Sequence, residues 1–173
     1  MTRGNAQGSS DTQTTASAGL AGHSRLVQRL RRRYVEELPL LASGAPTRAG
    51  MAECLAALRA RGHDTSAALR ILRQLVMERL VVLDCEQGAP LATVVTAVTE
   101  LAELTLDEAC TQAFAELDER HGAPLTEAGR HASFWVMGMG KLGARELNVS
   151  SDIDLIVLYD PGRFDYRGRR DIH

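Results

Sequence analysis

The chain has 173 residues, of which 45% are hydrophobic and 4% aromatic, and its formal net charge is −2. This length supports a domain with a hydrophobic core, and the near-neutral charge argues against a nucleic-acid binder that acts through bulk positive charge. No apolar run approaches the ~18 residues that a membrane helix needs, so we expect no membrane partner. Cys54, Cys85 and Cys110 form no C-x-x-C pair, which predicts free thiols in a reducing, cytoplasmic compartment.

The N-terminal region is predicted to be a disordered tail followed by helices. Residues 1–22 are rich in Ser, Thr and Gly and lack an apolar segment, which is typical of disorder. From His23 to Leu41 apolar residues recur three or four apart, which indicates a helix. The arginines within this run are interpreted as a solvated helix face that Glu36 and Glu37 partly balance, although a phosphate or nucleic-acid patch is the alternative.

Three further helices are predicted before residue 133. Thr47 is expected to cap the second, which Gly62 closes. Asp64 or Thr65 caps the third, over about residues 66–83. The fourth covers about residues 91–119, with a possible interruption at 105–107, and a loop follows at 121–132. Residues 23–132 are therefore predicted to be a helical lead-in.

After the loop the sequence changes character. Residues 134–140 (FWVMGMG) indicate a buried strand, residues 141–148 a short helix or turn, and residues 152–160 (DIDLIVLYD) a second strand. The predicted fold class is α+β, with a mostly helical N-terminal region leading into two strands. We expect residues 133–173 to be the start of a second, incomplete unit, because two strands alone make a poor sheet.

The run GMGKLG permits two interpretations. Gly138, Gly140 and Gly143 match G-x-G-x-x-G, and Asp160 lies where a dinucleotide-binding Rossmann site places an acid for the ribose. Against this, residues 148–151 favour a turn over a full crossover helix. Asp152 and Asp154 are also expected to share one face at the start of the second strand, ~7 Å apart. The two negative charges repel each other, so a fold keeps such a pair only where a cation or an acid–base task offsets the energetic cost.

The second interpretation is a nucleotidyltransferase palm, the polymerase-beta-like arrangement in which a glycine turn precedes a strand that carries D-x-D. The turn lets backbone N–H groups approach phosphate oxygens, and Lys141 adds a positive charge. Asp152 and Asp154 are then the catalytic, metal-binding residues, with hard oxygen ligands for two Mg²⁺ ions. The predicted nucleotide- or phosphate-binding residues are Gly138, Gly140, Lys141, Gly143, Ser150 and Ser151.

The segment GMGKLGARELNVSSDIDLIVLYD closely resembles the glutamine synthetase adenylyltransferase family, whose first transferase domain carries G-M-G-K-L-G-G-x-E-L-N-x-S-S-D-I-D-L. The helices before it, including LDCEQGAPLATVVTAVTELAE, are also similar to the lead-in of that domain. The resemblance covers most of residues 25–160. One position departs from the family: Ala144 stands where glycine is usual, and we expect the turn to tolerate the added methyl group.

The resemblance implies the N-terminal, adenylyl-removing domain of a two-activity enzyme that controls nitrogen assimilation. Inorganic phosphate attacks the AMP–tyrosine of glutamine synthetase and releases ADP, with Mg²⁺ as cofactor, while a second domain adds AMP from ATP. The implied partners are glutamine synthetase and the PII signalling protein. The family's third metal-binding carboxylate would lie beyond His173, so the chain alone is expected to be inactive. Two alternatives stay open: a dinucleotide-dependent oxidoreductase fragment and a non-enzymatic helical interaction module.

Overall fold

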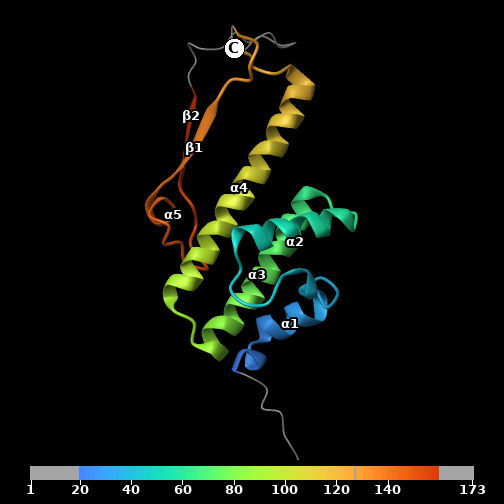
Figure 1. The fold of residues 1–173 in the computed structure, drawn as a ribbon, viewed down its shortest axis with the longest axis vertical. Helices are drawn as coiled ribbons and strands as arrows, with labels where there is room; N and C mark the ends of the chain where they lie inside the picture. The colour runs from blue at the N-terminus through green and yellow to red at the C-terminus, as the bar shows by residue number, and fades with distance from the viewer. Residues whose placement is uncertain (1–19, 127, 160–173) are drawn as a thin grey trace, which may run out of the picture.

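The computed structural model describes residues 20–126 and 128–159, and it confirms an α+β chain that is mostly helical. Figure 1 shows the helices α2, α3 and α4 beside a two-stranded hairpin. The described elements are η1 (Leu20–His23), α1 (Arg25–Arg33), η2 (Leu38–Leu40), α2 (Arg48–Ala60), α3 (Thr65–Gln87), α4 (Leu91–His121), β1 (Phe134–Gly138), α5 (Gly140–Gly143) and β2 (Leu155–Tyr159). Residues 1–19 of the predicted tail lie outside the described residues, and the prediction is wrong for residues 20–22, because they belong to η1 and Ala21 is buried.

The capping signals of α2 and α3 are confirmed. The Thr47 side chain accepts a hydrogen bond from the backbone N–H of Gly50 at 3.2 Å, and Asp64, rather than Thr65, accepts from the N–H of Ala67 at 2.7 Å. Each side chain satisfies one of the N–H groups that a first helical turn leaves unpaired. Gly88 ends α3 in the left-handed conformation with φ 60°, which glycine adopts without steric cost.

The helices differ from the expectation in several places, and α3 continues to Gln87, beyond the expected end near residue 83. The helical pattern continued to Leu41, but α1 ends at Arg33, and Pro39 lies in the short 3₁₀ helix η2. Proline lacks the N–H that an uninterrupted helix would need at this point. By contrast, α4 continues without the break suggested at residues 105–107. It contains neither glycine nor proline, and Leu104 and Leu106 pack against the core within that stretch.

The hydrophobic core lies among α2, α3 and the first half of α4. Its fully buried side chains include Met51, Leu55 and Leu58 of α2 and Leu72 and Leu75 of α3. The N-terminal half of α4 adds Val94, Val98, Leu101 and Leu104. Beyond the core, α4 extends as an arm beside the hairpin (Figure 1). The helical lead-in is therefore the platform on which the later segment rests.

The hairpin is antiparallel, and its register pairs Phe134 with Tyr159 and Gly138 with Leu155. All five β2 residues are exposed, so neither face of this strand is covered by the described residues. No helix within residues 20–126 and 128–159 has the length and apolar character to cross a membrane.

Candidate functional site

The glycine turn between β1 and α5 has two close approaches, one to backbone and one to a side chain, and one left-handed residue. A Cβ on Gly143 would lie 2.4 Å from the carbonyl oxygen of Gly138, and a Cβ on Gly138 would lie 2.8 Å from Cγ of Leu142. Gly140 has φ 53° with open space around it. All three glycines are thus required by the turn itself, two by packing and one by backbone conformation. Ala144 has φ −78°, a conformation that any residue adopts, so a methyl group fits there.

Some backbone N–H groups of the glycine turn are hydrogen-bonded within it, and others have no backbone acceptor among the described residues. Gly143 N–H donates to the carbonyl of Met139 at 3.3 Å, and Ala144 N–H donates to that of Gly140 at 2.9 Å. Within the described part of the chain, no backbone carbonyl accepts from the N–H groups of Gly140, Lys141 or Leu142. Unpaired N–H groups at such a turn can bind an anion. The side chain of Lys141 is exposed beside them.

Three apolar side chains anchor this segment to the helical core. Leu142 and Leu147 are buried, and Ile153 is half-buried against the same cluster. A polar contact supports them, because the N–H of Leu147 donates to the hydroxyl of Thr99 on α4 at 3.2 Å. That hydroxyl donates in turn to the carbonyl of Val95 at 2.8 Å. The site is positioned by the first half of α4.

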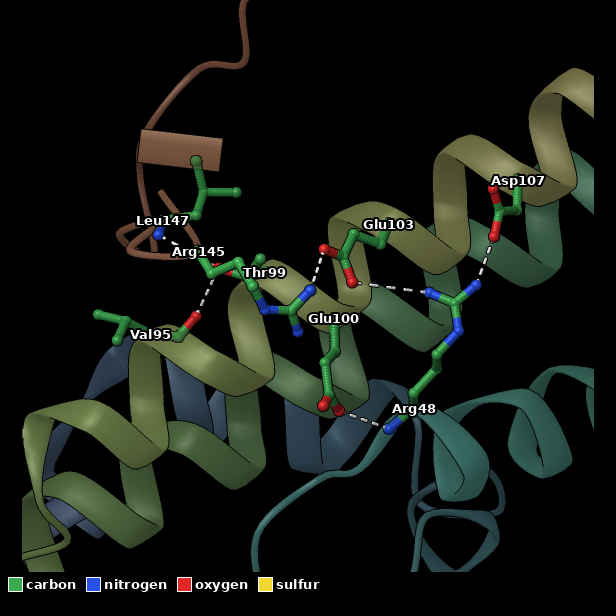
Figure 2. A network of polar contacts seen from close by, with 8 residues as sticks. All are labelled: Arg48, Val95, Thr99, Glu100, Glu103, Asp107, Arg145 and Leu147. Carbon is green, nitrogen blue, oxygen red and sulfur yellow. Dashed lines mark hydrogen bonds and ion pairs between the residues drawn. The ribbon is translucent and has the colours of Figure 1, made fainter. Parts of the chain in front are cut away.

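A second contact with α4 lies at Arg145, the one non-glycine residue with positive φ among those described, at 59°. Its guanidinium pairs with Glu103. Figure 2 shows Glu103 between Arg145 and Arg48, whose guanidinium also pairs with Asp107. The backbone N–H of Arg48 donates to Glu100 at 2.6 Å. One carboxylate face of α4 therefore holds both the start of α2 and the end of the glycine turn.

The D-x-D pair lies beside the glycine turn. The N–H of Met139 donates to the carbonyl of Asp154 at 2.9 Å, so the backbones of the two motifs are hydrogen-bonded. Asp152 and Asp154 are exposed and Ile153 between them is half-buried, an alternation that directs both carboxylates away from the core. The expectation that they open the second strand is wrong by a small margin, because β2 begins at Leu155.

The two carboxylates are available as ligands. Within residues 20–126 and 128–159 neither forms an ion pair, and no group of three acidic, imidazole or thiol side chains gathers there. Hard carboxylate oxygens suit Mg²⁺, so these two side chains fit this cation. They supply only two protein ligands for it. Ser150 is exposed and Ser151 half-buried, and the Ser151 N–H donates to the carbonyl of Asn148 at 3.1 Å. Both serines precede the carboxylates in the same turn.

The geometry is incompatible with a Rossmann site. A dinucleotide-binding βαβ unit joins two parallel strands by a full crossover helix. Here β1 and β2 are antiparallel neighbours, and α5 has four residues. Asp160, which completed the sequence match, lies outside the described residues.

Comparisons with known proteins agree with this geometry. The glutamate-ammonia ligase adenylyltransferase family matches the chain over residues 14–173. A bifunctional glutamine synthetase adenylyltransferase/adenylyl-removing enzyme from Aromatoleum aromaticum is 39% identical over 144 residues, which cover 79% of this chain and 15% of that protein. A protein of the same description from Ralstonia nicotianae is 40% identical over 147 residues, or 80% of this chain and 15% of its own length.

A third protein of this description, from Chromobacterium violaceum, is 48% identical over 96 residues, covering 55% of this chain and 11% of its own length. The chain thus spans about 15% of the length of the first two relatives. None of these matches supports a dinucleotide-dependent oxidoreductase.

Proposed function

Because the chain belongs to the glutamate-ammonia ligase adenylyltransferase family, we propose that residues 138–154 form part of the site at which AMP is removed from glutamine synthetase. The observation that carries the proposal is the 2.9 Å hydrogen bond that joins the glycine turn to the D-x-D segment at Met139 and Asp154. It joins the backbone of the turn that we propose binds phosphate to the backbone of the pair that we propose binds a cation. These are the two elements that a phosphoryl transfer needs.

In this proposal the substrate is the AMP–tyrosine of glutamine synthetase. An oxygen of inorganic phosphate attacks the AMP phosphorus, the bond from phosphorus to the tyrosine oxygen breaks, and ADP is formed. The tyrosine oxygen takes up a proton. The N–H groups of Gly140, Lys141 and Leu142 bind non-bridging phosphate oxygens, and the Lys141 ammonium balances their charge.

Asp152 and Asp154 would hold Mg²⁺, which when bound stabilises negative charge on the phosphoryl oxygens. Ser150 and Ser151 orient the two carboxylates or bind phosphate. The described residues bring no third acidic side chain to the pair, so we assign the third ligand to another part of the protein and expect no turnover by these 173 residues alone. The proposal also includes ATP or ADP as the nucleotide, PII as a regulatory partner and a cytoplasmic location for the protein.

A chimera tests the proposal, with this chain replacing its matched segment in the Aromatoleum aromaticum relative. We expect phosphate-dependent ADP release from adenylylated glutamine synthetase. Asp152→Asn with Asp154→Asn should lower that rate by at least about 10²-fold and leave AMP transfer from ATP within about twofold. The matched control is Asp84→Asn with Glu86→Gln, which removes two exposed carboxylates two residues apart on α3 that form no ion pair within the described residues. Loss of AMP transfer in place of AMP removal would contradict the assignment to the adenylyl-removing domain.

A further inference from the structure

A basic hollow of about 750 Å³ lies between α1 and α3, on elements that contribute nothing to the D-x-D site. Two arginines of α1 and two of α3 line it, together with residues from the turns that follow α1 and α2. The lining residues used below are Arg29, Arg33, Tyr34, Arg70, Ile71 and Arg73.

The four arginines converge because of helical spacing. Arg29 and Arg33 are four residues apart on α1, and Arg70 and Arg73 are three apart on α3, so each pair shares one helix face. The helices pack against each other, and the ion pair of Arg31 with buried Glu78 at 2.7 Å fixes one to the other. Arg31 is thereby neutralised, and it is not one of the residues that line the hollow.

The charge of the hollow is not balanced within the described residues. None of its four arginines forms an ion pair with a carboxylate of residues 20–126 or 128–159. Arg70 donates to the uncharged hydroxyl of Ser66 at 2.7 Å, and Glu37 is the one acid among the lining residues. The expected partial balance of the arginine run thus rests on Glu37, which lines the hollow without an ion pair to its arginines. Like charges gathered this way oppose one another, and a bound anion relieves that repulsion.

The lining also offers apolar surface. Leu30 is buried and Ile71 is half-buried beneath the arginines. The Arg33 guanidinium lies 5.4 Å from the centre of the Tyr34 ring, a cation–π contact that places an aromatic ring at the hollow. The volume is that of a small-molecule site.

We propose that this hollow binds a polyphosphate chain, free or carried by a nucleotide, at a site separate from the D-x-D pair. Guanidinium groups bind phosphate oxygens in a bidentate manner, and four of them around one hollow suit a ligand with several phosphate groups. A nucleotide can in addition place its base against Tyr34 and Ile71. The proposal goes beyond the transfer reaction, because these residues contact neither the glycine turn nor the carboxylates.

Titration calorimetry with ATP, in EDTA, tests the site on the whole protein. Without a divalent cation, Asp152 and Asp154 repel ATP, and the loss of binding when arginines of the hollow are replaced reports on the hollow itself. We expect Arg29→Gln with Arg70→Gln to weaken ATP binding by at least about tenfold. Arg25→Gln with Arg32→Gln removes the same charge from exposed positions outside the hollow and should change the affinity by less than about twofold. Circular dichroism checks that both variants keep their helices.

The remaining arms identify the ligand. The affinity for ATP should fall as salt is added, and adenosine should not bind. If inorganic triphosphate binds as tightly as ATP, the ligand is a free polyphosphate chain. If ATP binds more tightly than triphosphate, the ligand is a nucleotide. The proposal is overturned if ATP and triphosphate both fail to bind, or if Lys141→Gln abolishes binding while the Arg29/Arg70 variant retains it. An oligoglutamate peptide that binds more tightly than either phosphate would also overturn it and indicate a protein-docking surface.

Discussion

The hydroxyl of Thr99 on α4 accepts a hydrogen bond from the backbone N–H of Leu147, 48 residues further along the chain. The contact is buried, and Thr99 has no exposed surface. It fixes the end of the glycine turn to the helical platform, and Figure 2 shows it beside the ion pairs that link Arg145, Glu103 and Arg48. This side chain is therefore one of the contacts that position the candidate site on the helical platform, which makes the platform part of the site.

Thr99→Val should destabilise the protein by about 1–3 kcal/mol, because it leaves the buried N–H of Leu147 without an acceptor. Urea unfolding measures this change, and hydrogen exchange at Leu147 should accelerate. Thr111→Val is the control: its hydroxyl also donates to the carbonyl four residues earlier, that of Asp107 at 2.8 Å, but it is exposed. A Thr99→Val effect no larger than the control's would contradict this role.

Gly143→Ala should distort the glycine turn, because the new Cβ would lie 2.4 Å from the carbonyl oxygen of Gly138. Overpacking of this kind costs about 1–3 kcal/mol, and amide shifts of residues 138–144 should change with it. Gly50→Ala in α2 is the matched control. Its Cβ would meet Thr47 Oγ1 at an ordinary 3.5 Å, so unfolding should show no loss, or a gain of about 0.5–1 kcal/mol. Equal effects of the two substitutions would disprove the steric argument.

Cys54 should be unreactive in the folded protein. Burial raises the pKa of its thiol from 9.0 to about 11, although Arg61 lowers it in part. Because the folded state disfavours the thiolate, this contribution to stability is complete below pH 9.0 and is lost as the pH rises through about 11. With Cys85→Ser and Cys110→Ser, Ellman's reagent at neutral pH should label Cys54 only in denaturant.

The control for that experiment keeps exposed Cys85 alone, through Cys54→Ala with Cys110→Ser, and this thiol should react at once in the folded protein. Rapid labelling of Cys54 in the native state would show that the α2–α3 core opens readily.

His131 should titrate above its ordinary pKa of 6.5, because its Nε2 hydrogen-bonds to Asp118 at 2.7 Å and its Nδ1 to the carbonyl of Ala132. The raised pKa means that the contact stabilises the protein fully below pH 6.5 and loses its effect as the pH rises through the raised value. In NMR titrations, Asp118→Asn should lower the pKa of His131. Glu119→Gln, one residue away, should leave the pKa of His131 unchanged, and a shift of equal size there would indicate a general attraction to nearby negative charge.

The helical framework could be predicted from local signals. The helix ends could be predicted from Thr47, Asp64 and Gly88, because a helix cap is formed by contacts between residues a few positions apart. The continuity of α4 was harder to predict: residues 105–107 have modest helix propensity, and burial of Leu104 and Leu106 by other helices decides in favour of the helix.

The candidate site was predictable as a set of residues, since the glycines and the D-x-D pair stand close in sequence. The contacts that hold the site in place could not be predicted, because Thr99 and Leu147, like Glu103 and Arg145, are more than forty residues apart in sequence. The roles of Gly138 and Gly143 could be assigned only from the structure. From the sequence alone, a glycine that lets phosphate approach the backbone looks the same as one that lets another part of the chain approach it. The four arginines of the basic hollow come from two helices, so the run on α1 offered a phosphate patch only as an alternative and did not reveal the contribution of α3.

The most direct test of the central claim is paramagnetic broadening of amide NMR signals by Mn²⁺, a substitute for Mg²⁺. If the glycine turn and the D-x-D pair form one site, Mn²⁺ should broaden residues 139–143 together with residues 151–155, and Asp152→Asn with Asp154→Asn should abolish both effects. Broadening that spares the glycine turn, or that survives the double substitution while Asp107→Asn removes it, would contradict the claim that these residues form a nucleotidyl-transfer site.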